Sequence, residues 1–205
     1  MKYKGNPMLS QAEVEARLAP YMARIVRVIL DAWADWMVSG KSGRWKRKRS
    51  RANYIWEELA CRAEEAFAND PKVRIHPQNQ SVLFVVDDLA FRFKKSDASG
   101  LTNNYPTQTA LDFHDQQEEL PGIPKVQRLE VTYVLNALET AVQDILLVAR
   151  HRDTKLWSTS LLRNDEGRNV VPITVTATPN PSTPAPKTIK IPVKSKHEKK
   201  TENEP

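Results

Sequence analysis

The chain has 205 residues, 40% of them hydrophobic, and a single cysteine, Cys61. This size predicts one domain with a full core plus an additional segment, and one cysteine excludes both an intrachain disulfide framework and a multi-cysteine metal site. The net charge of +6 is uneven, because residues 41–51 carry seven cations and no acid and residues 164–205 carry seven cations against five acids, which leaves −3 for the rest. The fold is therefore not basic overall, and its charge points to one basic segment.

The N-terminal residues 1–9 are predicted to be flexible, and they contain no apolar stretch typical of a signal peptide. Ser10 and Glu13 then form a capping-box pattern that predicts the start of a helix. Apolar residues recur every three or four positions until Ser39-Gly40, which predicts about seven helical turns with a kink or restart at Pro20. The predicted stripe consists of Val14, Leu18, Met22, Ile25, Ile29, Trp33 and Trp36.

This stripe predicts packing against a core, although its two tryptophans also fit an anchor at a membrane surface. The longest apolar stretch, residues 21–38, contains two arginines and two aspartates, which are too many charges for a membrane-spanning helix. We expect a soluble cytoplasmic protein without a transmembrane segment, and the lone cysteine fits a reducing compartment.

Residues 41–51, which we call the basic segment, are predicted to form a loop. Cations that surround an aromatic ring suit a phosphate backbone with one stacked base, and they also suit anionic lipid headgroups. A solvated loop without a ligand is the alternative. The candidate nucleic-acid-binding residues are Lys41, Arg44, Trp45, Lys46, Arg47, Lys48, Arg49 and Arg51.

A second amphipathic helix is predicted over residues 53–68, and a short edge strand over residues 72–76. The unbroken apolar run at 82–86 predicts a buried strand, and Asp87-Asp88 predicts a hairpin turn or, less favourably, metal-binding carboxylates. The pattern then alternates, so Leu89, Phe91 and Phe93 share one face of a strand while Arg92 and Lys94 share the other.

Two neighbouring cations on one strand face repel each other unless an anion lies between them, so Arg92 and Lys94 predict a phosphate or carboxylate site. A solvated outer face of the sheet fits the same pattern. We expect the segment after this strand to form a wall of the site. The candidate anion-binding or ligand-binding residues are Arg92, Lys94, Lys95, Asn104, Tyr105 and Thr107.

Thr107 is predicted to cap a short helix over residues 108–118, and strands are predicted over residues 129–135, 142–150 and 155–162. The fold class predicted from these elements is α+β: two N-terminal helices packed on an antiparallel sheet of four to five strands, within a single domain at residues 10–163. The remainder, residues 164–205, contains seven of the 14 prolines and predicts a disordered basic tail, in which residues 170–177 are a candidate edge strand.

Most enzyme signatures are missing from the sequence, including phosphate-binding glycine loops, zinc motifs and nucleophile elbows. No cofactor, metal site or catalytic residue is therefore predicted, and whether the protein is an enzyme stays open. His114 is interpreted as a surface histidine rather than as an acid-base or metal-binding group. A loose nuclease-like arrangement of Asp87, Asp88 and Glu130 with Lys94 is kept as a weaker hypothesis.

Several short motifs point to a protein family. They are Arg92-Phe93-Lys94-Lys95, Asn104-Tyr105-Pro106-Thr107, Leu120-Pro121-Gly122-Ile123-Pro124, Thr132-Tyr133 and Trp157. Across residues 82–161 the chain resembles an uncharacterised bacterial family, similar to the toxin-side component of a RosmerTA-like toxin–antitoxin or phage-defence module. The resemblance implies a partner encoded nearby, a helix-turn-helix regulator with an ImmA/IrrE-type metallopeptidase domain, and it implies no catalytic residues in this chain.

Three functions therefore remain open. In the first, the chain is the toxin-side component of such a module. In the second, it binds nucleic acid, and even cleaves it, through the basic segment and the Arg92/Lys94 face. In the third, it acts on an anionic membrane surface through Trp33, Trp36 and the basic segment.

Overall fold

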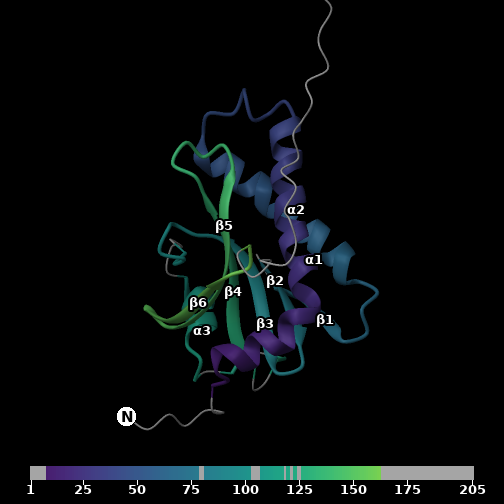
Figure 1. Cartoon of the computed structure of the whole chain (residues 1–205), viewed down its shortest axis with the longest axis vertical. Helices are drawn as coiled ribbons and strands as arrows, with labels where there is room; N and C mark the ends of the chain where they lie inside the picture. Colours follow the sequence, from purple (N-terminus) through teal and green to yellow (C-terminus); the bar gives the residue numbers. More distant parts are fainter. Residues whose placement is uncertain are drawn as a thin grey trace, which may run out of the picture. The chain divides into compact units, whose positions relative to one another are not determined.

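The computed structural model describes residues 8–78, 81–102, 107–117, 119–120, 122–123 and 126–162 (Figure 1). The predicted tail at residues 164–205 lies outside these residues, and so does the predicted flexible N-terminus except for Met8 and Leu9. The backbone N–H of Leu9 donates to Oε1 of Gln127 at 2.8 Å, which ties the chain to the domain just before the first helix.

Helix α1 (Gln11–Val38) begins at the predicted capping box, in which Ser10 and Glu13 bond reciprocally to each other's backbone N–H groups. The helix continues through Pro20 and ends at Ser39. Its predicted apolar stripe is buried except at Met22, which is half-buried, so the periodicity of the sequence correctly identified the core-facing side.

Helix α2 (Lys48–Phe67) begins five residues before the predicted start at residue 53. The last third of the basic segment is therefore helical rather than loop. Lysine and arginine are good helix formers, and no glycine or proline lies between Lys48 and Asn53. The apolar periodicity that indicated the helix starts only at Ile55, the first buried residue of α2, which explains the late predicted start.

Within the described residues the sheet has six strands in the order β1-β2-β3-β4-β5-β6, whereas four to five strands were predicted. The strands are β1 (Val73–Gln78), β2 (Ser81–Val86), β3 (Leu89–Lys95), β4 (Gln127–Leu135), β5 (Val142–His151) and β6 (Thr154–Ser160). The predicted antiparallel arrangement is also wrong at one place, because β3 and β4 are parallel while all other neighbours are antiparallel.

The long connection between β3 and β4 explains the parallel pair. Parallel neighbours require a crossover, and the segment 96–126 supplies it together with helix α3 (Gln108–His114). Thr107 caps α3 as predicted, since its side chain accepts from the N–H of Ala110, but the helix ends at His114 rather than at residue 118. Arg128 donates to the carbonyls of Asp112 and Asp115 at this end, and so satisfies acceptors that the short helix leaves free.

The helices lie on opposite faces of the sheet (Figure 1). Helices α1 and α2 cover the face that carries Phe84, Phe91 and Phe93, and they form the larger hydrophobic cluster with it. Helix α3 covers the other face, where Phe113 packs with Leu83, Val85 and Ala90 in a smaller cluster. The alternation predicted for residues 89–95 is confirmed, and it places Arg92 under α3.

Candidate functional site

Arg92 lies in the middle of β3 and faces a carboxylate on the neighbouring strand. The parallel register places Arg92 beside Glu130 of β4. Nε and Nη2 of Arg92 both donate to Oε1 of Glu130, at 3.1 and 2.7 Å, and both side chains are buried. Arg92 therefore already has an internal counter-ion, which removes the repulsion from which an external anion was predicted.

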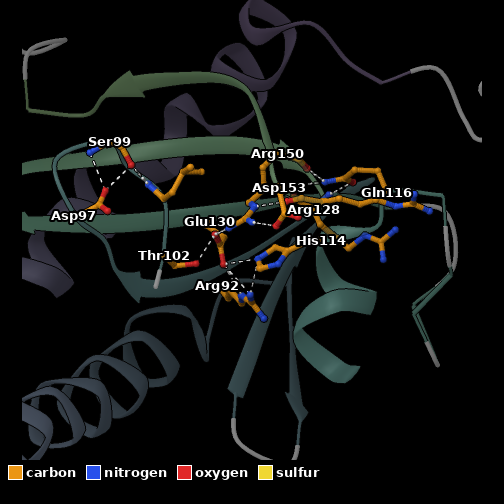
Figure 2. A network of polar contacts seen from close by, with 12 residues as sticks. Arg92, Asp97, Ser99, Thr102, His114, Gln116, Arg128, Glu130, Arg150 and Asp153 are labelled. Carbon is orange, nitrogen blue, oxygen red and sulfur yellow. Dashed lines mark hydrogen bonds and ion pairs between the residues drawn. The ribbon is translucent and has the colours of Figure 1, made fainter. Parts of the chain in front are cut away.

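Helix α3 and the sheet complete the surroundings of this pair (Figure 2). Nε2 of His114 lies 3.0 Å from Nη2 of Arg92 and 3.1 Å from Oε1 of Glu130, so it accepts from Arg92 in one tautomer and donates to Glu130 in the other. The Arg92 guanidinium stacks 3.7 Å from the centre of the Phe113 ring. His114 is buried here, so its interpretation as a surface histidine is wrong.

The second carboxylate oxygen of Glu130 has its own partners. The hydroxyl of Thr102 donates to Oε2 at 3.3 Å, and Nη1 of Arg150 lies 3.8 Å away. Burial alone raises the pKa of Glu130, but the contacts with His114 and Arg92 outweigh burial and lower the pKa to about 2. The carboxylate is therefore ionised at neutral pH, and it holds together strands and helix as a structural centre.

Lys94 lies on the same face as Arg92, one residue pair further along β3. Its ammonium group has no hydrogen bond or ion pair within the described residues. Thr132 lies beside Lys94 on β4, and its buried hydroxyl has no hydrogen-bond partner among the described residues either. Burial, and then repulsion from Arg92, lowers the pKa of Lys94. Lys94 is thus the member of the predicted anion site that has no counter-ion among the described residues.

Of the remaining predicted ligand residues, Lys95 lines the same cleft as Lys94 but forms an ion pair on the other face of the sheet. Lys95 points to the opposite, helix-covered side of the sheet, where its Nζ lies 3.1 Å from Oε1 of Glu139. Thr107 is exposed and caps α3, and Asn104 and Tyr105 lie outside the described residues. Ligand binding at Arg92 and Lys94 stays a prediction.

The exposed cations of the basic segment are grouped where α1 gives way to α2. Arg44, Lys46, Arg47 and Arg49 are exposed, and none of them has a hydrogen bond or ion pair from its side chain in the ranges that the structure describes. Lys48 and Arg51 differ, because both contact Glu139 in the turn between β4 and β5. Four unneutralised cations therefore occupy six consecutive positions.

Trp45 is held within an aromatic group rather than standing free. Its ring centre lies 6.0 Å from that of Trp36 and 6.2 Å from that of Tyr54, with an edge-to-face arrangement to the latter. Nζ of Lys41 lies 4.4 Å from the Tyr54 ring centre. Trp45 is still 43% exposed, so one part of the ring anchors the basic segment and the other part faces solvent.

Glu139 is the centre of a second charged cluster, which was not predicted from the sequence. Nζ of Lys48 lies 3.3 Å from its Oε2, Nζ of Lys95 lies 3.1 Å from its Oε1, and the guanidinium of Arg51 contacts Oε2. The hydrogen bond from Arg51, together with Lys95, outweighs burial and lowers the pKa of Glu139 to about 2. Glu139 lies in the turn between β4 and β5, and nothing local in the sequence shows that three distant cations meet it.

A cleft with a volume of about 1130 Å³ lies beside this cluster. Helix α2 forms one wall, and the end of β3 with the β4–β5 turn forms the other. Its lining includes Lys48, Arg49, Trp56, Lys95, Tyr133 and Glu139. The cleft therefore continues from the exposed cations of the basic segment into the domain.

The carboxylates of the nuclease-like hypothesis do not share a site. Asp88 forms an ion pair with Arg17, and Glu130 is enclosed with Arg92 and His114. Within the described ranges, no group of three or more His, Cys, Asp or Glu side chains is placed to hold a metal ion.

No family model, curated protein or solved structure matches this chain. Among the helices that the structure describes, none is long and apolar enough to cross a membrane.

Proposed function

We propose that the protein binds nucleic acid through the basic segment, by contacts to the phosphate backbone that do not depend on base sequence. The observation that carries this proposal is the set of four exposed cations, Arg44, Lys46, Arg47 and Arg49, without an anionic partner in the described part of the chain. Unpaired cations at this density attract a polyanion by releasing its condensed counter-ions.

The charge pattern of α2 supports the same proposal. The helix starts with Lys48, Arg49 and Arg51, has no acid in its first turn and receives no cap from the side chain of Arg47, whereas Glu64 and Glu65 lie near its end. This order is the reverse of the one that the helix dipole favours. Phosphates bound at the start of α2 would offset the repulsion between these cations and the positive end of the helix dipole, since they would accept from free N–H groups and pair with the cations.

Trp45 adds an aromatic surface beside the cations. Its packing against Trp36 and Tyr54 fixes the ring, and its exposed part is available to a base or a sugar. Because stacking on one ring needs a base that is not enclosed in a duplex, we expect the protein to prefer single strands.

The test compares two variants of equal net charge. One carries Arg44→Gln, Lys46→Gln, Arg47→Gln and Arg49→Gln; the control carries Arg27→Gln, Lys72→Gln, Arg74→Gln and Lys155→Gln, which are exposed cations elsewhere. Binding of a fluorescent single-stranded 20-mer is measured from 50 to 300 mM salt. We expect the first variant alone to lose binding and to reduce the log–log salt slope by about 3, because four cations each release about 0.7 counter-ion.

An equal loss of binding in both variants would show that overall charge, not the basic segment, is responsible, and it would overturn the proposal. Anionic lipid headgroups carry the same phosphate chemistry. Flotation with phosphatidylserine vesicles therefore separates the membrane hypothesis: vesicle binding without oligonucleotide binding would replace nucleic acid by a membrane surface.

The motifs between residues 82 and 161 favour a second proposal, that the protein is the toxin-side component of a two-gene module with a regulator encoded nearby. This proposal rests on the sequence resemblance alone. Its test is growth of cells that express the protein with and without the neighbouring regulator. Unchanged growth when the protein is expressed alone would exclude the toxin role, and failure of the two proteins to co-purify would exclude the partner.

A further inference from the structure

We propose that the cleft between α2 and the β4–β5 turn is a second anion site, which binds a phosphoryl group at the position that the carboxylate of Glu139 occupies. The site is formed by the cations Lys48, Arg51 and Lys95 around Glu139. Lys48, Lys95 and Glu139 line the cleft, and Arg51 contacts Glu139 from beside it. It goes beyond the proposed function, since it joins Lys95 and the cleft to two residues of the basic segment and binds its ligand at one point.

Three cations from two different elements converge on a single carboxylate. Lys48 and Arg51 come from the first turn of α2, and Lys95 comes from the end of β3. The side chains of Arg51 and Lys95 are 17% and 35% exposed, so packing holds them in place and solvent screens them less than it screens the exposed cations Arg44, Lys46, Arg47 and Arg49. The cluster carries two positive charges more than Glu139 neutralises.

The other acids of the cleft do not balance this excess. Asp97 accepts hydrogen bonds from the backbone N–H and the hydroxyl of Ser99, which hold it in its own loop. Glu57 is exposed and lies more than one turn beyond Arg51 along α2. Arg49 also lines the cleft, on the side of the cations.

A phosphoryl group matches the cluster better than a carboxylate does. A phosphate monoester carries a charge of about −1.5 to −2 and three acceptor oxygens, against one negative charge and two oxygens for Glu139. Glu139 lies in the turn between the two strands, beside the exposed Leu138 and Thr140, so its side chain can leave without disturbing the core. The Glu139 carboxylate therefore occupies the anion site in the absence of ligand, and the phosphoryl group displaces it.

The rest of the cleft indicates what the phosphoryl group is attached to. Its volume of about 1130 Å³ exceeds what phosphate alone requires, and the half-buried ring of Trp56 lines it together with Tyr133. A nucleoside suits such a wall, because its base presents a face for stacking. The phosphoryl group is thus that of a nucleotide, either free or at the end of a strand.

The experiment measures dissociation constants by calorimetry for four probes: inorganic phosphate, AMP, and one oligonucleotide with and without a 5′-phosphate. Glu139→Gln removes the internal competitor, and we expect it to tighten AMP binding on the order of tenfold. Lys95→Gln removes a donor, and we expect it to weaken AMP binding by a similar factor. Glu57→Gln is the matched control, since it removes one acid from the same cleft but away from the cluster.

Tighter binding of AMP by Glu139→Gln but not by Glu57→Gln would support the site, and Glu139→Asp, which keeps the charge, should show no gain. A preference for the phosphorylated oligonucleotide over AMP would assign a strand end, and the opposite preference a free nucleotide. Equal effects of Glu139→Gln and Glu57→Gln, measured at a temperature at which both variants are fully folded, would overturn the proposal. If the basic-segment variant still fails to bind the 20-mer, that result leaves the proposed function intact. If instead Glu139→Gln tightens AMP binding as expected but the basic-segment variant still binds the 20-mer, the proposed function is overturned and this site is not.

Discussion

Glu130 has no exposed surface, although it lies in the middle of a central strand and carries a charge. An isolated buried carboxylate is very unfavourable, so its stability in the fold depends on Arg92, His114, Thr102 and Arg150 around it. A buried ion pair adds little net stability compared with apolar residues, but removal of one partner leaves the other buried and uncompensated.

We therefore expect Glu130→Gln to lower the free energy of unfolding by about 3–5 kcal/mol, because Arg92 and Arg150 lose their shared carboxylate. Urea denaturation at pH 7 measures this change. The double variant Arg92→Met with Glu130→Gln is the control, and it should be more stable than Glu130→Gln alone because it removes one uncompensated charge. A loss below about 1 kcal/mol for Glu130→Gln would contradict a structural role for the pair.

The pKa of Glu130 makes stability depend on acid in a defined range. Its folded-state pKa of about 2 lies below the ordinary value of 4.5, so protonation favours the unfolded chain. This contribution is fully present above about pH 4.5 and is lost as the pH falls towards 2. We expect the unfolding free energy to decline over this range, and to decline less in Glu130→Gln.

Glu139 contributes in the same direction, since its pKa is also lowered to about 2. The variant Glu139→Gln should therefore also flatten the acid profile. Identical acid profiles for the unmodified protein and both single variants would show that neither carboxylate is linked to folding.

At the scale of the elements, α2 combines two requirements that conflict. Its apolar stripe, with Ile55, Leu59, Ala63 and Phe67 buried, packs it against the sheet. Its first turn presents cations at the positive end of the helix dipole, without a side-chain cap. Tertiary packing therefore stabilises a helix whose start is locally unfavourable.

We expect Arg47→Asp to raise the free energy of unfolding by about 1 kcal/mol in the absence of ligand, because aspartate caps free N–H groups at the N-cap position. The same variant should bind the single-stranded 20-mer more weakly. Arg44→Asp is the control with the same change of charge at an exposed position outside the helix. If both variants are equally stable in urea, the missing cap is not what limits the start of α2.

At the scale of the whole molecule, both hydrophobic clusters are built from residues between Leu9 and Leu162. The three helices and six strands of the described residues lie in the same part of the chain. Residues 164–205 carry a net charge of +2 and seven prolines. The hydrophobic contacts that the structure describes thus lie within residues 9–162.

We expect deletion of residues 164–205 to leave the free energy of unfolding unchanged to within about 0.5 kcal/mol, because no described core residue is removed. Thermal and urea denaturation of the full chain and the shortened chain measure this. A loss above about 1 kcal/mol would mean that this segment packs on the domain, for example through the candidate strand at residues 170–177.

Local patterns in the sequence determined most of the elements. The capping box at Ser10, the cap at Thr107, the turn at Asp87-Asp88 and the inward-facing rings of Phe91 and Phe93 were all predicted, because each depends on residues within a few positions of one another. The module assignment and nucleic-acid binding stay predictions, since the structure bears on neither.

Only the tertiary structure decided the direction of β4 beside β3, the enclosure of Arg92 by Glu130 and His114, and the meeting of Lys48, Arg51 and Lys95 at Glu139. These features join residues between 16 and 91 positions apart, and no periodicity within one element specifies which strand becomes its neighbour or in which register. The charge of a residue can be read from the sequence, but its counter-ion is chosen by strand pairing and helix packing.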